Sequence, residues 1–352
     1  MNTSLQDFGF VPFFAQQTSL DEIGQGRVAR VTEVQRSLLR VAGESGERSI
    51  ALTASRRTTD VECRPTVGDW VVLDDQCSRV ERVLDRKSLF RRVAAGEKAE
   101  VQLIAANIDV LFVVTSCNEE FKESRLERYL ALAAEAGVIP VVVLTKIDLS
   151  GEPARYAQRA RRVQPGVAVE MVNALERSTL NGVLAWIEPG STVALVGSSG
   201  VGKSTLLNTL AGSTIAATGE IREDDKKGRH TTSHRALHRL PGGGLLIDVP
   251  GMRGLKVADL DTALTTVFDD IEAMASNCKF ADCRHEAEPG CAVLSAVEDG
   301  NIDPRRLHNY RKLIRENERN SASLAEKREQ GRAFARLVKQ VKAVKQGRRT
   351  QD

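Results

Sequence analysis

One segment of the sequence combines glycines, a lysine and hydroxyl groups at the spacing of a phosphate-binding loop. It matches GxxxxGK[ST] and consists of Gly197, Ser198, Ser199, Gly200, Val201, Gly202, Lys203, Ser204 and Thr205. Glycines let backbone N–H groups converge on phosphate oxygens at the positive end of a helix. Lys203 would neutralise charge on the β- and γ-phosphates, and Ser204 would ligate Mg²⁺. The segment lies between the apolar run TVALV and the helical run STLLNTLAG, so we predict a nucleotide site rather than a simple Gly-rich turn.

A second segment indicates which base is bound. Thr145, Lys146, Ile147 and Asp148 end the apolar run IPVVVL. A carboxylate at Asp148 can accept hydrogen bonds from N1–H and from the exocyclic amine of guanine, whereas adenine offers neither donor. TKxD alone is common, but its place at a strand end favours GTP. Further along the chain, Asn173 and Ala174 are expected to form the backbone contact to the guanine O6.

Two more segments fit the magnesium and γ-phosphate end of the same site. Asp248 and Gly251 match DxxG after the run LLIDV, so Asp248 would hold Mg²⁺ through water and the Gly251 N–H would contact the γ-phosphate. Thr231 and Thr232 lie in a polar loop upstream, as expected for switch I. The predicted magnesium residues are therefore Ser204, Thr231, Thr232 and Asp248, with Lys203 and Thr232 among the catalytic residues.

A fourth segment has the residue types of a metal site. Cys278, Cys283, His285 and Cys291 fall within CKFADCRHEAEPGCAV. Three thiolates and one imidazole complete a tetrahedral zinc site with no open position, so the zinc would be structural. The alternative is a set of buried apolar cysteines beside an unrelated histidine.

The elements that would position these residues form three regions. Five short β-like runs from residue 26 to 84 predict a small barrel, either an OB-fold or an SH3-like barrel. Apolar runs at 108–115, 139–145, 190–196 and 245–249, with a helix at 125–137, predict an α/β domain whose parallel sheet is covered on both faces. Helices are expected at 258–275 and 306–347. We thus predict a flexible N-terminal arm over 1–25, an OB-fold-like barrel over 26–98, a nucleotide-binding domain over 99–257 and a zinc-binding helical domain with a basic C-terminal helix over 258–352.

The order of the motifs is unusual. In ordinary GTPases the guanine motif follows DxxG, but here Asp148 precedes the phosphate loop and nothing like NKxD follows Gly251. The domain is therefore predicted to be a circularly permuted GTPase domain. With the barrel in front and the cysteines behind, the chain closely resembles the RsgA (YjeQ) family of small-ribosomal-subunit-dependent GTPases.

This resemblance implies an activity and partners. It implies a GTP hydrolase that binds the small (30S) ribosomal subunit and its 16S rRNA, acts late in its assembly, and is released after ribosome-stimulated hydrolysis. It also implies zinc on the cysteine pattern, Mg²⁺ with GTP, and His230 as the group that positions or activates water. A simply solvated histidine is the alternative for His230. We further expect other assembly factors as partners, no membrane association and a monomeric chain.

Two residues depart from the usual GTPase pattern. Thr145 stands where most GTPases have Asn, which would weaken the hold on the base. Met252 follows DxxG where Ras-like enzymes have the glutamine that orients water, so the intrinsic rate of hydrolysis should be low.

Composition and charge limit the remaining possibilities. The 352 residues are 41% hydrophobic and 28% charged, which indicates a folded protein. The net charge of +3 conceals a C-terminal segment, 305–352, with 15 Lys/Arg against 5 Asp/Glu. In the barrel region, basic charge comes from Arg27, Arg30, Arg36, Arg40, Arg56 and Arg57. No apolar run approaches the ~20 residues of a membrane helix, and the N-terminus lacks the pattern of a secretory signal. Scattered cysteines favour a reducing compartment, so we expect the cytoplasm.

Two other functions remain open from the residues alone. One is an ATP-dependent P-loop enzyme in which TKID is accidental. The other is a zinc-containing RNA-binding protein in which the nucleotide only switches conformation.

Overall fold

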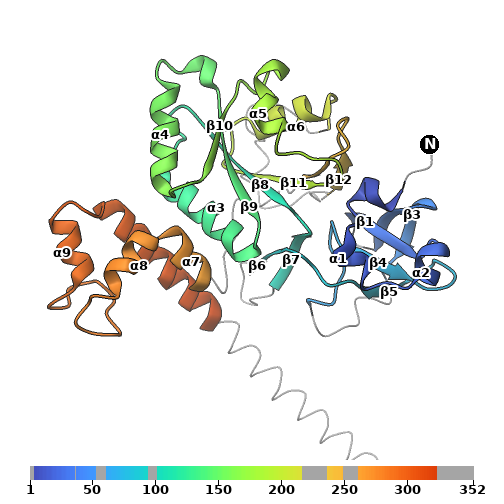
Figure 1. Ribbon diagram of the computed structural model, residues 1–352, viewed down its shortest axis with the longest axis horizontal. Coiled ribbons are helices and arrows are strands. Elements are labelled where there is room, and N and C mark those ends of the chain that lie inside the picture. Colours follow the sequence, from blue (N-terminus) through green and yellow to red (C-terminus); the bar gives the residue numbers. More distant parts are fainter. Residues whose placement is uncertain are drawn as a thin grey trace, which may run out of the picture.

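A computed structural model describes residues 4–35, 37–52, 61–93, 101–215, 236–248 and 261–322 (Figure 1). Its central sheet contains five parallel strands in the order β10-β9-β8-β11-β13, followed by the antiparallel strand β12. Their bounds are β8 (Val110–Ser116), β9 (Ile139–Thr145), β10 (Ala168–Met171), β11 (Thr192–Val196), β12 (Ala236–Arg239) and β13 (Leu245–Asp248). The predicted parallel sheet is confirmed, and β12, which was not predicted, adds an antiparallel strand to it.

Helices cover both faces of this sheet because alternate strand residues point to opposite sides. Leu111 and Val113 share one core with α3 (Glu123–Ala136) and α4 (Pro153–Val163), whereas Phe112 and Val114 share another with α6 (Lys203–Ala211). The second face also receives η4 (Arg177–Leu180) and α5 (Asn181–Leu184). The strands β8 and β11 are consequently buried along their whole length and apolar at most positions, which is the pattern that the sequence showed.

The barrel region contains five antiparallel strands in the order β3-β2-β1-β4-β5. They are β1 (Val28–Val34), β2 (Leu38–Gly43), β3 (Gly46–Ala51), β4 (Trp70–Leu73) and β5 (Val80–Val83). Their inward side chains, such as Val31 and Leu39, form a separate core. A single register pair between Glu33 and Ala236 joins β1 to β12, so the two sheets are continuous.

A two-stranded ribbon follows the barrel. β6 (Leu89–Val93) pairs antiparallel with β7 (Val101–Ala106). The predicted boundary between residues 98 and 99 therefore falls between two strands that pair with each other.

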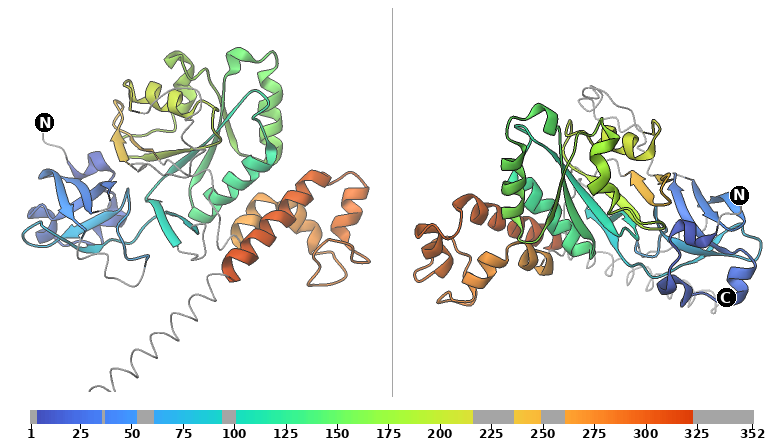
Figure 2. Two further views of the ribbon diagram at one scale, coloured as in Figure 1. Left: turned by 180° about the vertical axis from the view of Figure 1, so that it is seen from behind. Right: turned by 45° about the horizontal axis from the view of Figure 1, so that its top comes forward.

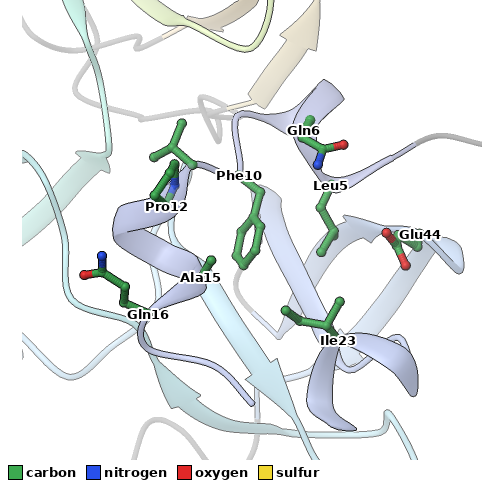
Figure 3. Close-up of a pocket in the computed structure, with 9 residues that line it drawn as sticks. Leu5, Gln6, Phe10, Pro12, Ala15, Gln16, Ile23 and Glu44 are labelled. Carbon is green, nitrogen blue, oxygen red and sulfur yellow. The ribbon is translucent and has the colours of Figure 1, made fainter. Parts of the chain in front are cut away.

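The expectation of a flexible arm over residues 1–25 is wrong for its described part. From Ser4 onward the chain forms η1 (Leu5–Phe8), α1 (Pro12–Ala15) and α2 (Leu20–Gly24). Phe10 and Phe14 pack on Trp70 of β4 with ring centroids 4.8 and 5.8 Å away. Elements this short show no periodicity, and their stability comes from these aromatic contacts. A pocket of about 570 Å³ lined by Leu5, Phe10 and Ile23 lies against this segment (Figure 3).

The C-terminal region is helical, as predicted, but its first helix is broken. α7 (Asp261–Val267) and α8 (Asp269–Ala275) are separated at Phe268, whose φ and ψ of −115° and 40° are not helical. Phe268 is fully buried and its ring lies against Tyr310, with centroids 5.3 Å apart. α9 (Ala292–Glu298) and a helix over 304–322 complete the region (Figure 2). No helix in the described part of the chain is long and apolar enough to span a membrane.

The C-terminal region is fastened to α3 by a buried carboxylate. Glu127 is fully buried, and it accepts hydrogen bonds from Arg305 at 3.1 Å and from Asn309 at 2.5 Å. Nearby, Arg128 forms a two-bond ion pair with Glu316 at 2.8 and 2.6 Å. These contacts place the helix over 304–322 against the nucleotide-binding domain.

Candidate nucleotide site and metal centre

The carboxyl ends of the parallel strands bring the nucleotide motifs to one edge of the sheet. The phosphate loop follows β11, the TKID segment ends β9, Asn173 follows β10, and Asp248 ends β13. This edge is where open α/β sheets bind their ligands. The motif residues that the structure describes are thus brought together despite their separation in the sequence.

The phosphate loop is held in shape by the strand beside it. Gly197 has a φ of 151°, and a Cβ there would lie 2.2 Å from the Val114 carbonyl oxygen. Gly202 has a φ of 90° and caps the N-terminus of α6, where the free N–H groups of the first turn begin. Lys203 Nζ donates to the carbonyl oxygen of Ser198 within the loop. The loop therefore has the form of an anion cradle, with its lysine already inside the site.

Thr145, the last residue of β9, supports the phosphate loop through its side chain. Its side chain is fully buried, and its hydroxyl donates to the Val201 carbonyl at 2.5 Å and lies 3.2 Å from the Thr115 carbonyl. Thr145 therefore has a role at the phosphate loop besides its place in the segment expected to bind the base. In this structure the residue connects β9 to the phosphate loop.

The base end is formed by two short segments after β9 and β10. Lys146 takes a left-handed conformation with φ 56°, and Ile147–Leu149 form η3, on which Asp148 is exposed. In the segment after β10, the side-chain oxygen of Asn173 accepts from Leu175 N at 3.1 Å, and the Ala174 carbonyl accepts from Thr209 Oγ1 at 2.6 Å. The hydrogen bond from Thr209 links Ala174, which is expected to lie near the base, to α6, which begins at the phosphate loop.

The magnesium end is described only in part. Asp248 is half-buried at the end of β13, and Ser204 lies in the first turn of α6. The predicted residues His230, Thr231, Thr232 and Gly251 lie outside the described residues, as does Met252.

Arg125 is a residue at this site that the motifs did not predict. From the first turn of α3, its Nη1 donates to Ser198 Oγ at 2.6 Å and to Glu120 at 2.8 Å. Arg125 holds the pKa of Glu120 below its usual range. No sequence signal could have shown this contact, because 73 positions separate Arg125 from Ser198.

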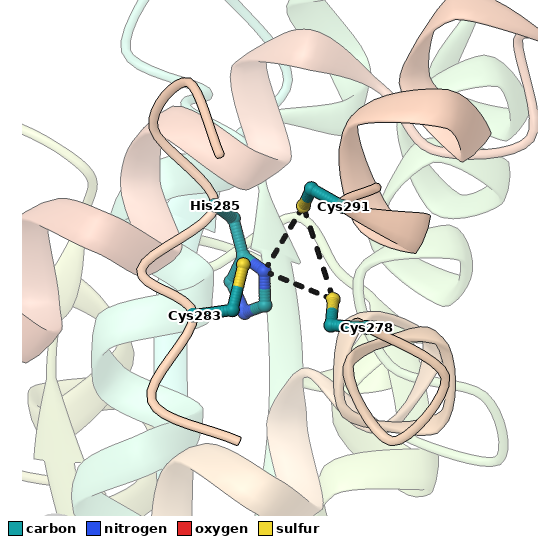
Figure 4. A group of neighbouring side chains, drawn as sticks. All are labelled: Cys278, Cys283, His285 and Cys291. Carbon is teal, nitrogen blue, oxygen red and sulfur yellow. Dashed lines mark hydrogen bonds between the residues drawn. The ribbon is translucent and has the colours of Figure 1, made fainter. Parts of the chain in front are cut away.

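The four predicted metal ligands converge in the C-terminal region (Figure 4). His285 Nδ1 lies 3.4 Å from Cys291 Sγ and 3.6 Å from Cys278 Sγ, and these two sulfurs are 3.8 Å apart. All four ligand atoms, including that of Cys283, lie within 4.8 Å of one another. Zinc bonds of about 2.3 Å to sulfur and 2.0 Å to nitrogen would give tetrahedral edges of roughly 3.5–3.8 Å.

The surroundings of this cluster also suit a metal. Burial lowers the pKa of His285, so the neutral imidazole that binds metals is favoured. Among the described residues, the buried atoms Nε and Nη2 of Arg311 have no hydrogen-bond partner, and the charge of Arg311 acts on His285. Zinc with three thiolates carries one net negative charge, which an adjacent guanidinium would balance. The residues present therefore fit a structural zinc site.

Of the six barrel arginines, the three that the structure describes each have an acidic or hydrogen-bonding partner. Arg30 is 1% exposed and donates to Thr192 Oγ1 at 2.8 Å. Arg27 is paired with Asp75 and Glu81, and Arg40 with Glu33. Arg36, Arg56 and Arg57 lie outside the described residues.

Comparisons with known proteins agree with this site. A family model described as RsgA GTPase matches residues 83–258. The chain is 46% identical over 344 residues to "Small ribosomal subunit biogenesis GTPase RsgA 2" of Vibrio parahaemolyticus, covering 98% of this chain and 94% of that protein.

The fold is similar to two solved structures. One is YjeQ from Thermotoga maritima, with a TM-score of 0.59 at 26% identity, covering 82% of this chain and 98% of that one. The other is YloQ, described as a circularly permuted GTPase, with a TM-score of 0.57 at 22% identity, covering 86% of this chain and 99% of that one. Together with the order of the strands, these folds confirm the predicted circular permutation.

Proposed function

This chain belongs to the RsgA GTPase family, whose members hydrolyse GTP, and we propose that it does so on the small ribosomal subunit during a late step of that subunit's assembly. The observation that carries the proposal is the near full-length similarity to a relative named for small-subunit biogenesis. Family membership favours this function over an ATP-dependent P-loop enzyme. The activity assigned to the site is hydrolysis of the β–γ phosphoanhydride of GTP.

The phosphate loop and its neighbours would perform the binding step. We propose that Lys203 leaves the Ser198 carbonyl and moves to the β- and γ-phosphates, while the first N–H groups of α6 bind the remaining phosphate oxygens. Asp148 would read guanine, with Asn173 and Ala174 at the O6 side. Ser204, Thr231, Thr232 and Asp248 would hold Mg²⁺, which neutralises phosphate charge when bound.

The hydrolysis step needs a group that positions water. We assign this role to His230, with Thr232 closing over the γ-phosphate and Gly251 contacting it. This assignment rests on the sequence, since Met252 cannot supply the amide found in Ras-like enzymes.

Coupling to the ribosome would use the connection after β13. Asp248 ends β13, and α7, which packs on α3, begins only thirteen positions later at Asp261. We propose that γ-phosphate loss acts through this connection on the C-terminal region, so that the GTP form binds small subunits tightly and hydrolysis promotes release.

The remaining assignments follow from the same function. We propose that the chain acts in the cytoplasm as a monomer, with 16S rRNA as its main partner and other assembly factors as further ones. The subunit is contacted by the barrel over 26–98 and by the domain over 258–352. Zinc stabilises the domain over 258–352, and the domain over 99–257 hydrolyses GTP.

Co-sedimentation with purified small subunits tests the proposal. Binding should be stronger with a non-hydrolysable GTP analogue than with GDP, and subunits should accelerate hydrolysis. Binding that depends on nucleotide without any acceleration would instead favour an RNA-binding protein with a nucleotide switch. The absence of both effects would refute the proposal.

A further inference from the structure

Helix α4 has an unusual charge for a surface helix. Its sequence, PARYAQRARRV, contains four arginines and no acidic residue. The buried side consists of Ala157, Ala160 and Val163, which pack on the sheet. The opposite side faces solvent at the outer margin of the nucleotide-binding domain (Figure 1).

The exposed arginines lie on one face of this helix. Arg155, Gln158 and Arg162 are spaced i, i+3 and i+7, and Arg161 borders them. All four are exposed, and the side chain of Arg155 is 72% accessible. We call these four residues the α4 face.

Unlike Arg27 and Arg40 of the barrel region, the arginines of the α4 face carry charge that is not neutralised locally. Among the described residues, Arg161 and Arg162 have no acidic partner. Arg155 has only Glu152 at 3.4 Å, and that pair is exposed on both sides, so it contributes little. By contrast Arg159, at the border of the face, pairs with Glu123 at 2.6 Å.

Helix stability explains only part of this pattern. Arg161 and Arg162 lie in the last turn, where cations interact favourably with the helix dipole. Arg155 lies in the first turn, where a cation is unfavourable for the same reason. Its position therefore points to a ligand outside the helix.

The α4 face connects two regions of the proposed function. Its first turn follows the guanine segment that ends at Leu149, and its last residue, Val163, accepts a hydrogen bond from Arg306 of the C-terminal region at 2.9 Å. An anionic partner bound along α4 would thus lie beside both the nucleotide edge and the C-terminal region (Figure 2).

We propose that the α4 face binds phosphates of the RNA of the small ribosomal subunit. This inference rests on the proposed function for the identity of the RNA. Arginine suits the role because its planar guanidinium pairs with phosphate through two hydrogen bonds. The contact positions the protein on the RNA without reading its sequence.

Neutralising the face tests the proposal in the full-length protein. A triple variant, Arg155→Gln, Arg161→Gln and Arg162→Gln, should bind purified small subunits about tenfold more weakly or worse in the presence of a non-hydrolysable GTP analogue. The slope of log affinity against log salt should shrink by about 2, because each lost phosphate contact removes roughly 0.7–0.9. GTP hydrolysis without subunits and thermal unfolding should change little.

The matched control keeps the positive charge of the α4 face. Arg155→Lys, Arg161→Lys and Arg162→Lys retain three cations at the same positions and should leave the salt slope nearly unchanged. Equal losses of salt slope in both triple variants, or no loss of subunit affinity in the glutamine triple, would overturn the proposal. If the unmodified protein bound no subunits, the proposed function itself would fail.

A photo-crosslinking phenylalanine analogue in place of Gln158 identifies the partner directly. Crosslinks to 16S rRNA would support the proposal. Crosslinks to ribosomal protein alone would overturn it in favour of an acidic protein partner.

Discussion

The phosphate loop and the metal centre of this chain are built in opposite ways. The loop offers mainly backbone groups, and its shape is set by residues of the neighbouring sheet, including the Val114 carbonyl and the buried Thr145 hydroxyl. The metal centre offers four side chains from one short segment, 278–291. Among the described residues from Ser276 to Gly290, only His285 is buried.

The metal centre should therefore depend on its ligand for folding, whereas the phosphate loop should not. The loop is preorganised by a core that exists without nucleotide, so GTP adds affinity and charge neutralisation. The metal segment has almost no core of its own, so a bound metal would supply much of its folding free energy. Damage to the two sites should therefore have different consequences.

The largest effect should follow Lys203→Ala. Removing the charge at the phosphates should lower the rate of GTP turnover by about a thousandfold or more. Metal content and thermal unfolding should stay unchanged, because Lys203 supports no part of the core. Single-turnover hydrolysis measures this, with the exposed Lys312→Ala as the control. Normal turnover in Lys203→Ala would mean that the phosphate loop is not the active site.

Cys283→Ser should have the reverse consequences. Losing one of four ligands should release the metal and lower the unfolding temperature of the C-terminal region by about 10 °C or more. Nucleotide binding by the core should persist. Elemental analysis and hydrogen exchange over 261–322 measure both, with the exposed Cys63→Ser as the control. If Cys283→Ser lost zinc but kept a folded C-terminal region, the metal centre would not depend on its ligand for folding.

The motifs were predictable from sequence because their chemistry is local. Phosphate cradling requires glycines and lysine at fixed spacing, and a zinc site requires four soft ligands close together. The buried strands were predictable for a similar reason: β8, β9 and β11 are apolar on both faces. Even the permutation could be predicted from motif order alone.

The features that escaped prediction depend on contacts between distant residues. Thr145 looked like a weak substitute for Asn, yet its hydroxyl supports the loop at Val201. The N-terminal segment folds because Phe14 meets Trp70, and the α7–α8 break places Phe268 against Tyr310. The acidic partners of two barrel arginines, Asp75 for Arg27 and Glu33 for Arg40, are known only from the fold.

His230→Ala tests the part of the nucleotide site that the structure does not describe. Subunit-stimulated hydrolysis should fall about 100-fold while nucleotide affinity stays nearly constant, as expected for a group that orients or activates water. His308→Ala, an exposed histidine of the C-terminal region, serves as the control. Unchanged stimulated turnover would leave His230 as a solvated residue.

Arg311→Met tests how the charge of the metal centre is balanced. This change keeps an apolar stem but removes the guanidinium whose buried atoms lack a partner. Zinc affinity should fall about tenfold, as is typical when a group outside the ligand shell is lost. Competition with a chromogenic chelator measures this, and Arg311→Lys should retain part of the affinity. Unchanged zinc affinity in Arg311→Met would show that the thiolate charge is balanced elsewhere.

The smallest effect should follow Thr145→Val, which tests whether the Thr145 hydroxyl holds the phosphate loop in its binding conformation. Valine keeps the shape of threonine but leaves the Val201 carbonyl without its buried donor, at a cost of about 1 kcal/mol. Because the loop contacts the phosphates of both nucleotides, GTP and GDP affinity should fall together by about fivefold, with metal content unchanged. Titration with fluorescent nucleotides measures this, and Thr145→Ser should restore affinity by restoring the hydroxyl. If Thr145→Val instead altered the preference for guanine over other bases and left the affinity for phosphate intact, Thr145 would act on the base, and the loop would owe its shape to the glycines alone.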